Sequence, residues 1–200
     1  MSKYVLRNTM LDLLLRIEQG SGYSHLLIDH ELKSRKIPEK DRGLLTEVVY
    51  GTIQRKMTLD YYLNHFIDSK KKQKPWVIML LRMSIYQMVF LAKVPAHAII
   101  HEAVEIAKHR GHKGIASFVT GVLRNVQRQG VPDTSLIDDQ AKRLSIETSH
   151  PEWLVRQWIK DYGFETTKDM CFENLNHKPI SVRVQPLKIT REEALERLAD

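Results

Sequence analysis

The sequence predicts an all-α protein whose main part is a helical bundle. Glycine and proline are scarce, with 9 and 7 in 200 residues, and sparse turn residues favour long helices over many short strands. Apolar residues recur at intervals of three and four through the first 130 residues, which is typical of amphipathic helices. Residues 75–92 are apolar almost all round, as expected of a central helix that its neighbours bury.

Four amphipathic helices are predicted before this apolar run. The first ends at Gly20 and Gly22, because glycine commonly follows the last turn of a helix. The third opens at Pro38, where a first-turn proline is tolerated and the acidic Glu39 and Asp41 suit the amino end of a helix. The four helices are expected at residues 4–19, 25–34, 38–53 and 58–67.

The apolar run is too short for a membrane span, which needs about 20 apolar residues. Arg82, Ser84 and Gln87 also interrupt it. We therefore expect no membrane association and place the run at the centre of the bundle. Two further amphipathic helices are expected at residues 97–110 and 115–129.

The last third of the chain has a different pattern. Ile180, Val182 and Val184 alternate with polar residues, which predicts a strand, and Thr190 with Glu193 has the spacing of a capping box at a helix start. Because a single strand has no partner to pair with, we expect the truncated start of a small α+β subdomain. Helices are expected before it at residues 140–144 and 152–175. The expected domains are the bundle at 1–130, a linker at 131–139, and the helical connection with the α+β start at 140–200.

The positive charge lies in the first two thirds of the chain. The net charge is +7; residues 1–130 carry 21 basic and 11 acidic side chains, and residues 131–200 carry 10 and 13. This asymmetry favours a polyanionic partner for the bundle, most often a nucleic acid, although ordinary solubilising charge is the alternative. Eight cations are the candidate phosphate contacts: Lys3, Arg7, Arg42, Arg55, Lys56, Lys113, Arg124 and Arg128.

No residue pattern predicts catalysis or a metal site. His97 and His101 share a helix face with Glu105, but a zinc-protease helix needs a second histidine where Glu105 stands, and no third ligand is evident. Cys171 has no histidine at a spacing that signals an activating base, so we interpret it as a buried structural cysteine. A Gly-rich phosphate loop and a dinucleotide fingerprint are also missing. We therefore expect no metal ligand, no cofactor-binding residue and no catalytic residue in this chain.

Several segments resemble a known family. They are DRGLLTEVVYGTIQRKMTLDYYL (41–63), LRMSIYQMVFLAKVPAHAIIHEAVEIAK (81–108), FVTGVLRNVQR (118–128), HPEWLVRQW (150–158) and NHKPISVRV (176–184). The first three are similar to a NusB-like domain. Together with the last two they resemble the amino-terminal half of the RsmB/Sun/Fmu family, the bacterial small-subunit ribosomal RNA 5-methylcytosine methyltransferases. Thr120 and Gln185 depart from that family, which usually has asparagine at both positions.

The resemblance implies an RNA-binding helical bundle, a small RRM-like subdomain and an S-adenosylmethionine-dependent catalytic domain. The chain lacks the family's Gly-rich cofactor loop and its Pro-Cys motif, so no catalytic or cofactor residue can be assigned here. The same pattern has recurring positions at Asp41, Arg42, Gly51, Arg55, Arg82 and Arg124. We expect Gly51 to mark a close helix–helix contact, Arg82 to pair internally and Asp41–Arg42 to form an ion pair at a helix start.

Three functions are compatible with these observations. The first is the RNA-binding part of a ribosomal RNA cytosine-5 methyltransferase, a cytoplasmic monomer that contacts small-subunit ribosomal RNA. In this case S-adenosylmethionine serves the parent protein and is not bound by this chain. The second is a free-standing NusB-like antitermination factor, which leaves residues 140–200 unexplained. The third is an interaction module whose apolar helix faces form a homo-oligomer without RNA. The first explains both parts of the chain.

Overall fold

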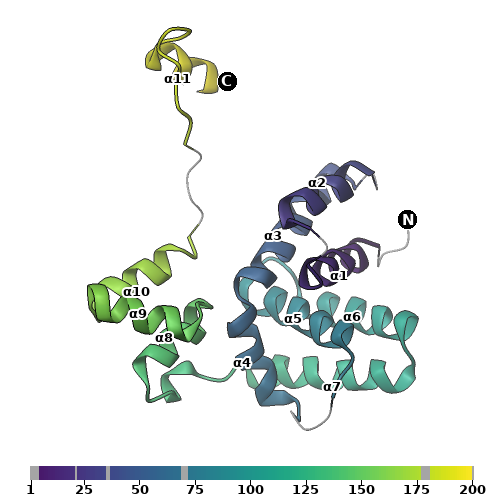
Figure 1. Ribbon diagram of the computed structural model, residues 1–200. Helices are drawn as coiled ribbons and strands as arrows, with labels where there is room; N and C mark the ends of the chain where they lie inside the picture. The colour runs from purple at the N-terminus through teal and green to yellow at the C-terminus, as the bar shows by residue number, and fades with distance from the viewer. Residues whose placement is uncertain (1–4, 21, 35–36, 69–71, 177–180, 200) are drawn as a thin grey trace.

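The computed structural model describes residues 5–20, 22–34, 37–68, 72–176 and 181–199. Helices α1 to α7 pack as a bundle, α8 to α10 form a second group beside α4, and α11 lies apart from both (Figure 1). The bundle helices are α1 (Val5–Glu18), α2 (Ser24–Ser34), α3 (Glu39–Gln54), α4 (Lys56–Phe66), α5 (Pro75–Phe90), α6 (Ala96–Arg110) and α7 (Lys113–Gln129). They are followed by η1 (Thr134–Leu136), α8 (Gln140–Thr148), α9 (Glu152–Tyr162), α10 (Phe164–Glu173) and α11 (Arg191–Ala199).

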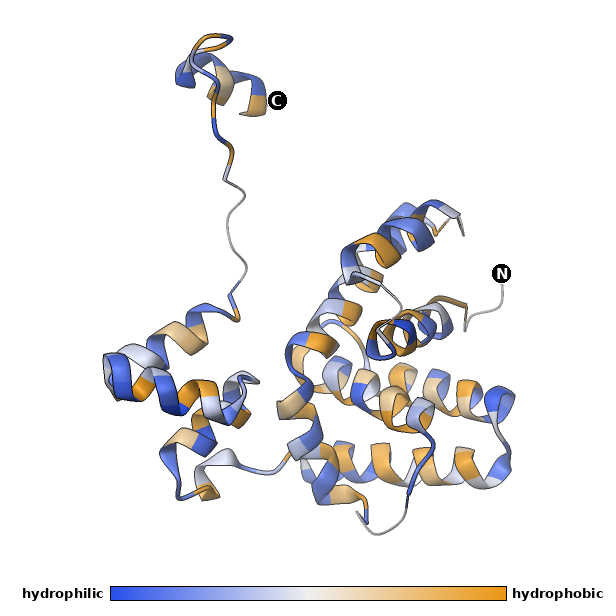
Figure 2. Cartoon of the chain, in the orientation of Figure 1, coloured by the Kyte–Doolittle hydropathy of each residue, from blue (hydrophilic) through white to orange (hydrophobic). Residues whose placement is uncertain are grey.

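Helix α5 is the centre of the bundle, as predicted. It packs against α1, α3, α4, α6 and α7. Leu80, Leu81 and Ile85 are completely buried there, and Pro75 is the first residue of the helix. Hydrophobic residues line the facing sides of the bundle helices in Figure 2. Within the described ranges, no helix combines the length and the apolar character needed to cross a membrane.

The predicted close contact at Gly51 is confirmed. A Cβ placed on Gly51 would lie 2.0 Å from the ring of Tyr86, so only glycine lets α3 approach α5 at this point. The Tyr86 hydroxyl donates a hydrogen bond of 2.6 Å to Glu47 Oε1. Burial and this carboxylate both raise the pKa of Tyr86 far above its ordinary value.

Besides α8, which ends at Thr148 and not at residue 144, two predicted helices differ from the structure. Helix α4 begins at Lys56, directly after α3 and Arg55, and not at Thr58. The side chain of Thr58 instead joins α4 to the last turn of α8 and to Ser149 after it. In the second case, the helix expected at residues 152–175 is two helices, because Gly163 adopts a φ of 82° that ends α9 and begins α10.

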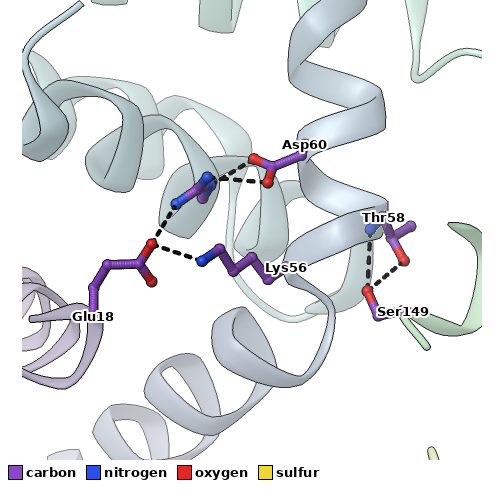
Figure 3. Close-up of polar contacts among 6 residues, drawn as sticks. Glu18, Lys56, Thr58, Asp60 and Ser149 are labelled. Carbon is purple, nitrogen blue, oxygen red and sulfur yellow. Dashed lines mark hydrogen bonds and ion pairs between the residues drawn. The ribbon is translucent and has the colours of Figure 1, made fainter. Parts of the chain in front are cut away.

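Helices α8, α9 and α10 enclose a small apolar core of their own. Its buried residues are Ala141, Leu144, Val155 and Cys171. This group is joined to the bundle at α4, where the hydroxyl of buried Thr58 donates 2.6 Å to the carbonyl of Ile146 and its backbone N–H donates 3.1 Å to Ser149 Oγ (Figure 3). Hydrogen bonds to α4 therefore help to set the position of the second group, and Gln54 of α3 adds another, from Nε2 to the carbonyl of Asn174 at 3.2 Å.

The predicted strand is not observed. Residues 181–185 are extended without ladder partners, and Ile180 lies outside the described residues. A β-strand needs a neighbour to satisfy its backbone groups, and the described part of the chain supplies none. The capping box is confirmed: Glu193 N–H donates to Thr190 Oγ1 at 3.2 Å, and Thr190 N–H donates to Glu193 Oε2 at 2.9 Å.

Candidate RNA interface

The outer face of α7 carries three of the predicted cations. Lys113, Arg124 and Arg128 are exposed, and the helix contains no aspartate or glutamate along its 17 residues. Its opposite face holds the helix in the bundle through buried Ala116 and Val119, among others. The sequence folds this way because apolar residues recur on one side of the helix while the cations fall on the other. A rigid helix therefore presents these charges to solvent.

The charges on this face are not neutralised by carboxylates. Among the described residues, neither Lys113 nor Arg124 has an ion-pair partner. Arg128 donates from Nη2 to Oδ1 of Asn125 at 2.7 Å, which fixes the guanidinium without cancelling its charge. Exposed arginines on one helix face are well suited to bind phosphate oxygens.

The structure removes Arg7 from the set of candidate RNA contacts. Its side chain is 8% exposed, Nη1 lies 2.6 Å from Glu102 Oε1, and Nε donates to Gln87 Oε1 at 2.8 Å. These bonds join α1 to α5 and α6. A buried guanidinium needs such partners because an unpaired buried charge is costly. Arg7 is therefore an internal bridge of the bundle.

The other described candidate cations lie on or beside α3 and α4. Arg55 stacks on the ring of Phe90, with its guanidinium carbon 4.3 Å from the ring centre. Arg42 is exposed and donates from Nε to the carbonyl of Ile37 at 3.3 Å, which ties it to the loop before α3 and not to Asp41. Lys3 lies outside the described residues. The structure thus brings together three of the eight candidates.

Lys56 belongs to a network of four charges between α1, α4 and α5 (Figure 3). Its Nζ lies 2.6 Å from Glu18 Oε1, and the same oxygen lies 3.8 Å from Arg82 Nη1. Arg82 also donates to both carboxylate oxygens of Asp60, at 2.6 and 3.0 Å. The predicted internal pairing of Arg82 is therefore confirmed. The roles of Glu18 and Asp60 were not predicted, because helical periodicity does not reveal partners on distant helices.

The histidines and Cys171 provide no second site. His97 and His101 are exposed on α6. In the part of the chain that the structure describes, no three His, Cys, Asp or Glu side chains come together as a potential metal site. Cys171 is completely buried, as predicted, and burial raises the pKa of its thiol. A buried thiol with a raised pKa is a poor nucleophile.

Comparisons with known families match both parts of the chain. Residues 5–128 match the NusB family, and residues 150–200 match the ferredoxin-like domain of RsmF/B-like methyltransferases. The solved structure of NusB from T. maritima aligns with a TM-score of 0.57 at 18% identity, covering 66% of this chain and 94% of that chain. This structural likeness establishes a shared bundle fold.

Two curated relatives extend the similarity along the whole chain. A probable ribosomal RNA small subunit methyltransferase B of Bacillus subtilis is 52% identical over 199 residues, which are 100% of this chain and 44% of that protein. A protein of the same name from Synechocystis is 31% identical, covering 94% of this chain and 43% of its own length. The chain therefore spans less than half of these relatives. It belongs to the NusB family, and over its length it is similar to the amino-terminal part of small-subunit ribosomal RNA methyltransferases.

Proposed function

We propose that this chain is the RNA-binding part of a small-subunit ribosomal RNA cytosine-5 methyltransferase. The observation that carries the proposal is the similarity of the whole chain, bundle and following helices alike, to the amino-terminal part of proteins named as ribosomal RNA small subunit methyltransferases. The unneutralised cations of α7 supply the RNA contact. The parent protein is proposed to be a cytoplasmic monomer.

The bundle's part in the reaction is to hold the RNA. Lys113, Arg124 and Arg128 bind phosphates, which positions the strand without reading its sequence. The methyl transfer belongs to a part of the parent protein outside these 200 residues, where S-adenosylmethionine supplies the methyl group. A cysteine thiolate there would add to the cytosine ring and so activate the ring carbon that accepts the methyl group; loss of the proton from that carbon and departure of the thiolate would then restore the ring. The target base must leave its stack to reach that site.

A free-standing antitermination factor is the second candidate, and one observation disfavours it. Such a factor accounts for the NusB match at residues 5–128 but not for the methyltransferase-type match at residues 150–200. The proposed methyltransferase accounts for both.

Reversal of the α7 charge tests the RNA-binding proposal. Arg124→Glu combined with Arg128→Glu should weaken binding of a labelled small-subunit ribosomal RNA fragment by about tenfold or more in dilute salt. The dependence of log K on log salt should become shallower by about 2, because two phosphate contacts are lost. Fluorescence anisotropy across a salt series measures both quantities.

The matched control is Lys142→Glu combined with Lys160→Glu. Both lysines are exposed, on α8 and α9, and the change in net charge is identical. This variant should keep most of the affinity. Equal loss in the two double variants would show a general charge effect and would remove the α7 face from the proposal.

A further inference from the structure

Lys56, Glu18 and Arg82 border an open cavity between α1, α3, α4 and α5. The cavity measures about 200 Å³ and is lined on its apolar side by Leu14, Ile17 and Met79, among others. The three charged groups form its polar side. Here a predicted RNA-binding cation lines a cavity and is held there by a carboxylate.

The carboxylate of Glu18 is held only weakly at this position. Glu18 is the last residue of α1, where the helix dipole disfavours a negative charge, and Gly20 follows with a φ of 71°. Its side chain is 42% exposed and that of Lys56 is 44% exposed. Ion pairs this exposed to water contribute little to stability. A solvent-side anion can therefore replace Glu18 at small cost.

The cationic side of the network does not depend on Glu18. Arg82 is 14% exposed and is fixed by its two bonds to Asp60. Lys56 is the first residue of α4, where the amino end of the helix adds positive potential. Movement of Glu18 away from the cavity leaves Lys56 without a carboxylate and leaves Arg82 in place. An anion that arrives from solvent then meets an ammonium group beside a fixed guanidinium.

We propose that Lys56 is a second RNA-contact point, and that Glu18 occupies it as an internal competitor of an RNA phosphate. A phosphate oxygen takes the place of Glu18 Oε1 on Lys56 Nζ, and the apolar side of the cavity receives the adjoining ribose. Glu18 thus restrains binding until an RNA strand displaces it. This inference rests on the proposed RNA-binding function and adds a site away from α7.

The test compares the neutral variant Glu18→Gln with a matched control on the same helix. Asp12→Asn also removes one carboxylate charge from α1, where Asp12 pairs with Arg110. Glu18→Gln should tighten binding of a labelled single-stranded RNA by about two- to fivefold, because the competing pair is weak. It should leave the slope of the salt dependence unchanged, because the same phosphate contact to Lys56 forms in both chains. Asp12→Asn should change neither quantity.

A double-variant cycle with Lys56→Gln isolates the site. The gain from Glu18→Gln should disappear in the Lys56→Gln background, because the cation for which Glu18 competes is gone. A gain of equal size in both backgrounds would show a general charge effect and overturn the proposal. Unchanged affinity together with a lowered melting temperature would show that Glu18 only bridges helices, and would also overturn it.

The same measurements distinguish failure here from failure of the proposed function. Reversal of Arg124 and Arg128 could abolish binding while Glu18→Gln and Lys56→Gln leave the RNA affinity unchanged. In that case the RNA-binding function stands and Lys56 is not part of it. If the α7 reversal has no effect on binding, the proposed RNA interface fails irrespective of Glu18.

Discussion

The contacts of some single residues could be predicted from the sequence, and those of others could not. Gly51 and Arg82 lie where a close contact and an internal ion pair were predicted. Arg7 does not lie on the surface, because its partners Gln87 and Glu102 are 80 and 95 positions away and only the packed bundle brings them to it. Sequence spacing identifies which face of a helix a residue occupies, but it does not identify what covers that face.

His150 gives a pH-dependent prediction at the same scale. The Thr148 hydroxyl donates to the carbonyl of Leu144, so His150 Nδ1–H donates to Thr148 Oγ1 at 3.0 Å and Nε2 accepts from Asn174 Nδ2 at 3.3 Å. Burial lowers the pKa of His150 below its ordinary value. The unfolded chain thus binds the proton more readily, so the folded state loses stability as pH falls below about 6.5.

Replacement of this histidine should reduce that loss. His150→Gln should show a smaller fall in melting temperature between about pH 7.5 and about pH 5.5 than the parent chain, because the buried imidazole no longer has to be protonated. The control His97→Gln changes an exposed histidine and should leave the fall unchanged. An identical fall in the parent and in His150→Gln would contradict the assignment.

Secondary-structure elements were predictable where periodicity persisted over several turns. The seven bundle helices were all expected, and most of their ends lie within two residues of the predicted positions. The division of residues 152–175 into α9 and α10 was missed, because a single glycine inside a helical pattern is compatible with a continuous helix. Only its positive φ shows that Gly163 is a boundary. The strand predicted at 180–184 is not formed at the described residues 181–184, because alternation alone does not supply a partner strand.

The same substitution at two glycines, one inside a helix and one between two helices, should change the stability of the chain in opposite directions. Gly121 lies within α7, is exposed, and has nothing within 4 Å of an added Cβ, so Gly121→Ala should stabilise the chain by about 0.5–1 kcal/mol. Gly163 has a φ of 82° between α9 and α10, so Gly163→Ala should destabilise it by about 1 kcal/mol or more. Urea denaturation measures both, and a change of the same sign in the two variants would contradict this assignment of their backbone roles.

At the scale of the whole molecule, the chain has two apolar cores of unequal size. The bundle core draws on α1 to α7, whereas the core of α8 to α10 has four fully buried apolar residues. The smaller group also leaves Leu136, Trp153 and Tyr162 exposed at its surface. Its position next to α4 was not predictable from the sequence, because it is set by hydrogen bonds between residues about 90 positions apart.

Thr58→Val tests this junction while keeping the side chain's shape. Thr58 is 2% exposed, and the change leaves the carbonyl of Ile146 without its hydroxyl donor. The free energy of unfolding should fall by about 1–3 kcal/mol. Protease cleavage within residues 131–139 should become faster, because the second group is held less firmly. If the variant is cleaved at the same rate as the parent chain and has the same free energy of unfolding, the junction does not depend on Thr58.

The order of helices along the bundle has a consequence for its synthesis. Many of its helices pack against their neighbours in sequence, including α5 on α6 and α6 on α7. Bundles with such local contacts fold in about microseconds to milliseconds, whereas translation adds about 5–20 residues per second. The relatives are more than twice as long as this chain. If this chain is the amino-terminal part of a protein of that length, as proposed, the bundle has time to fold on the ribosome, with its α7 face complete, before synthesis ends.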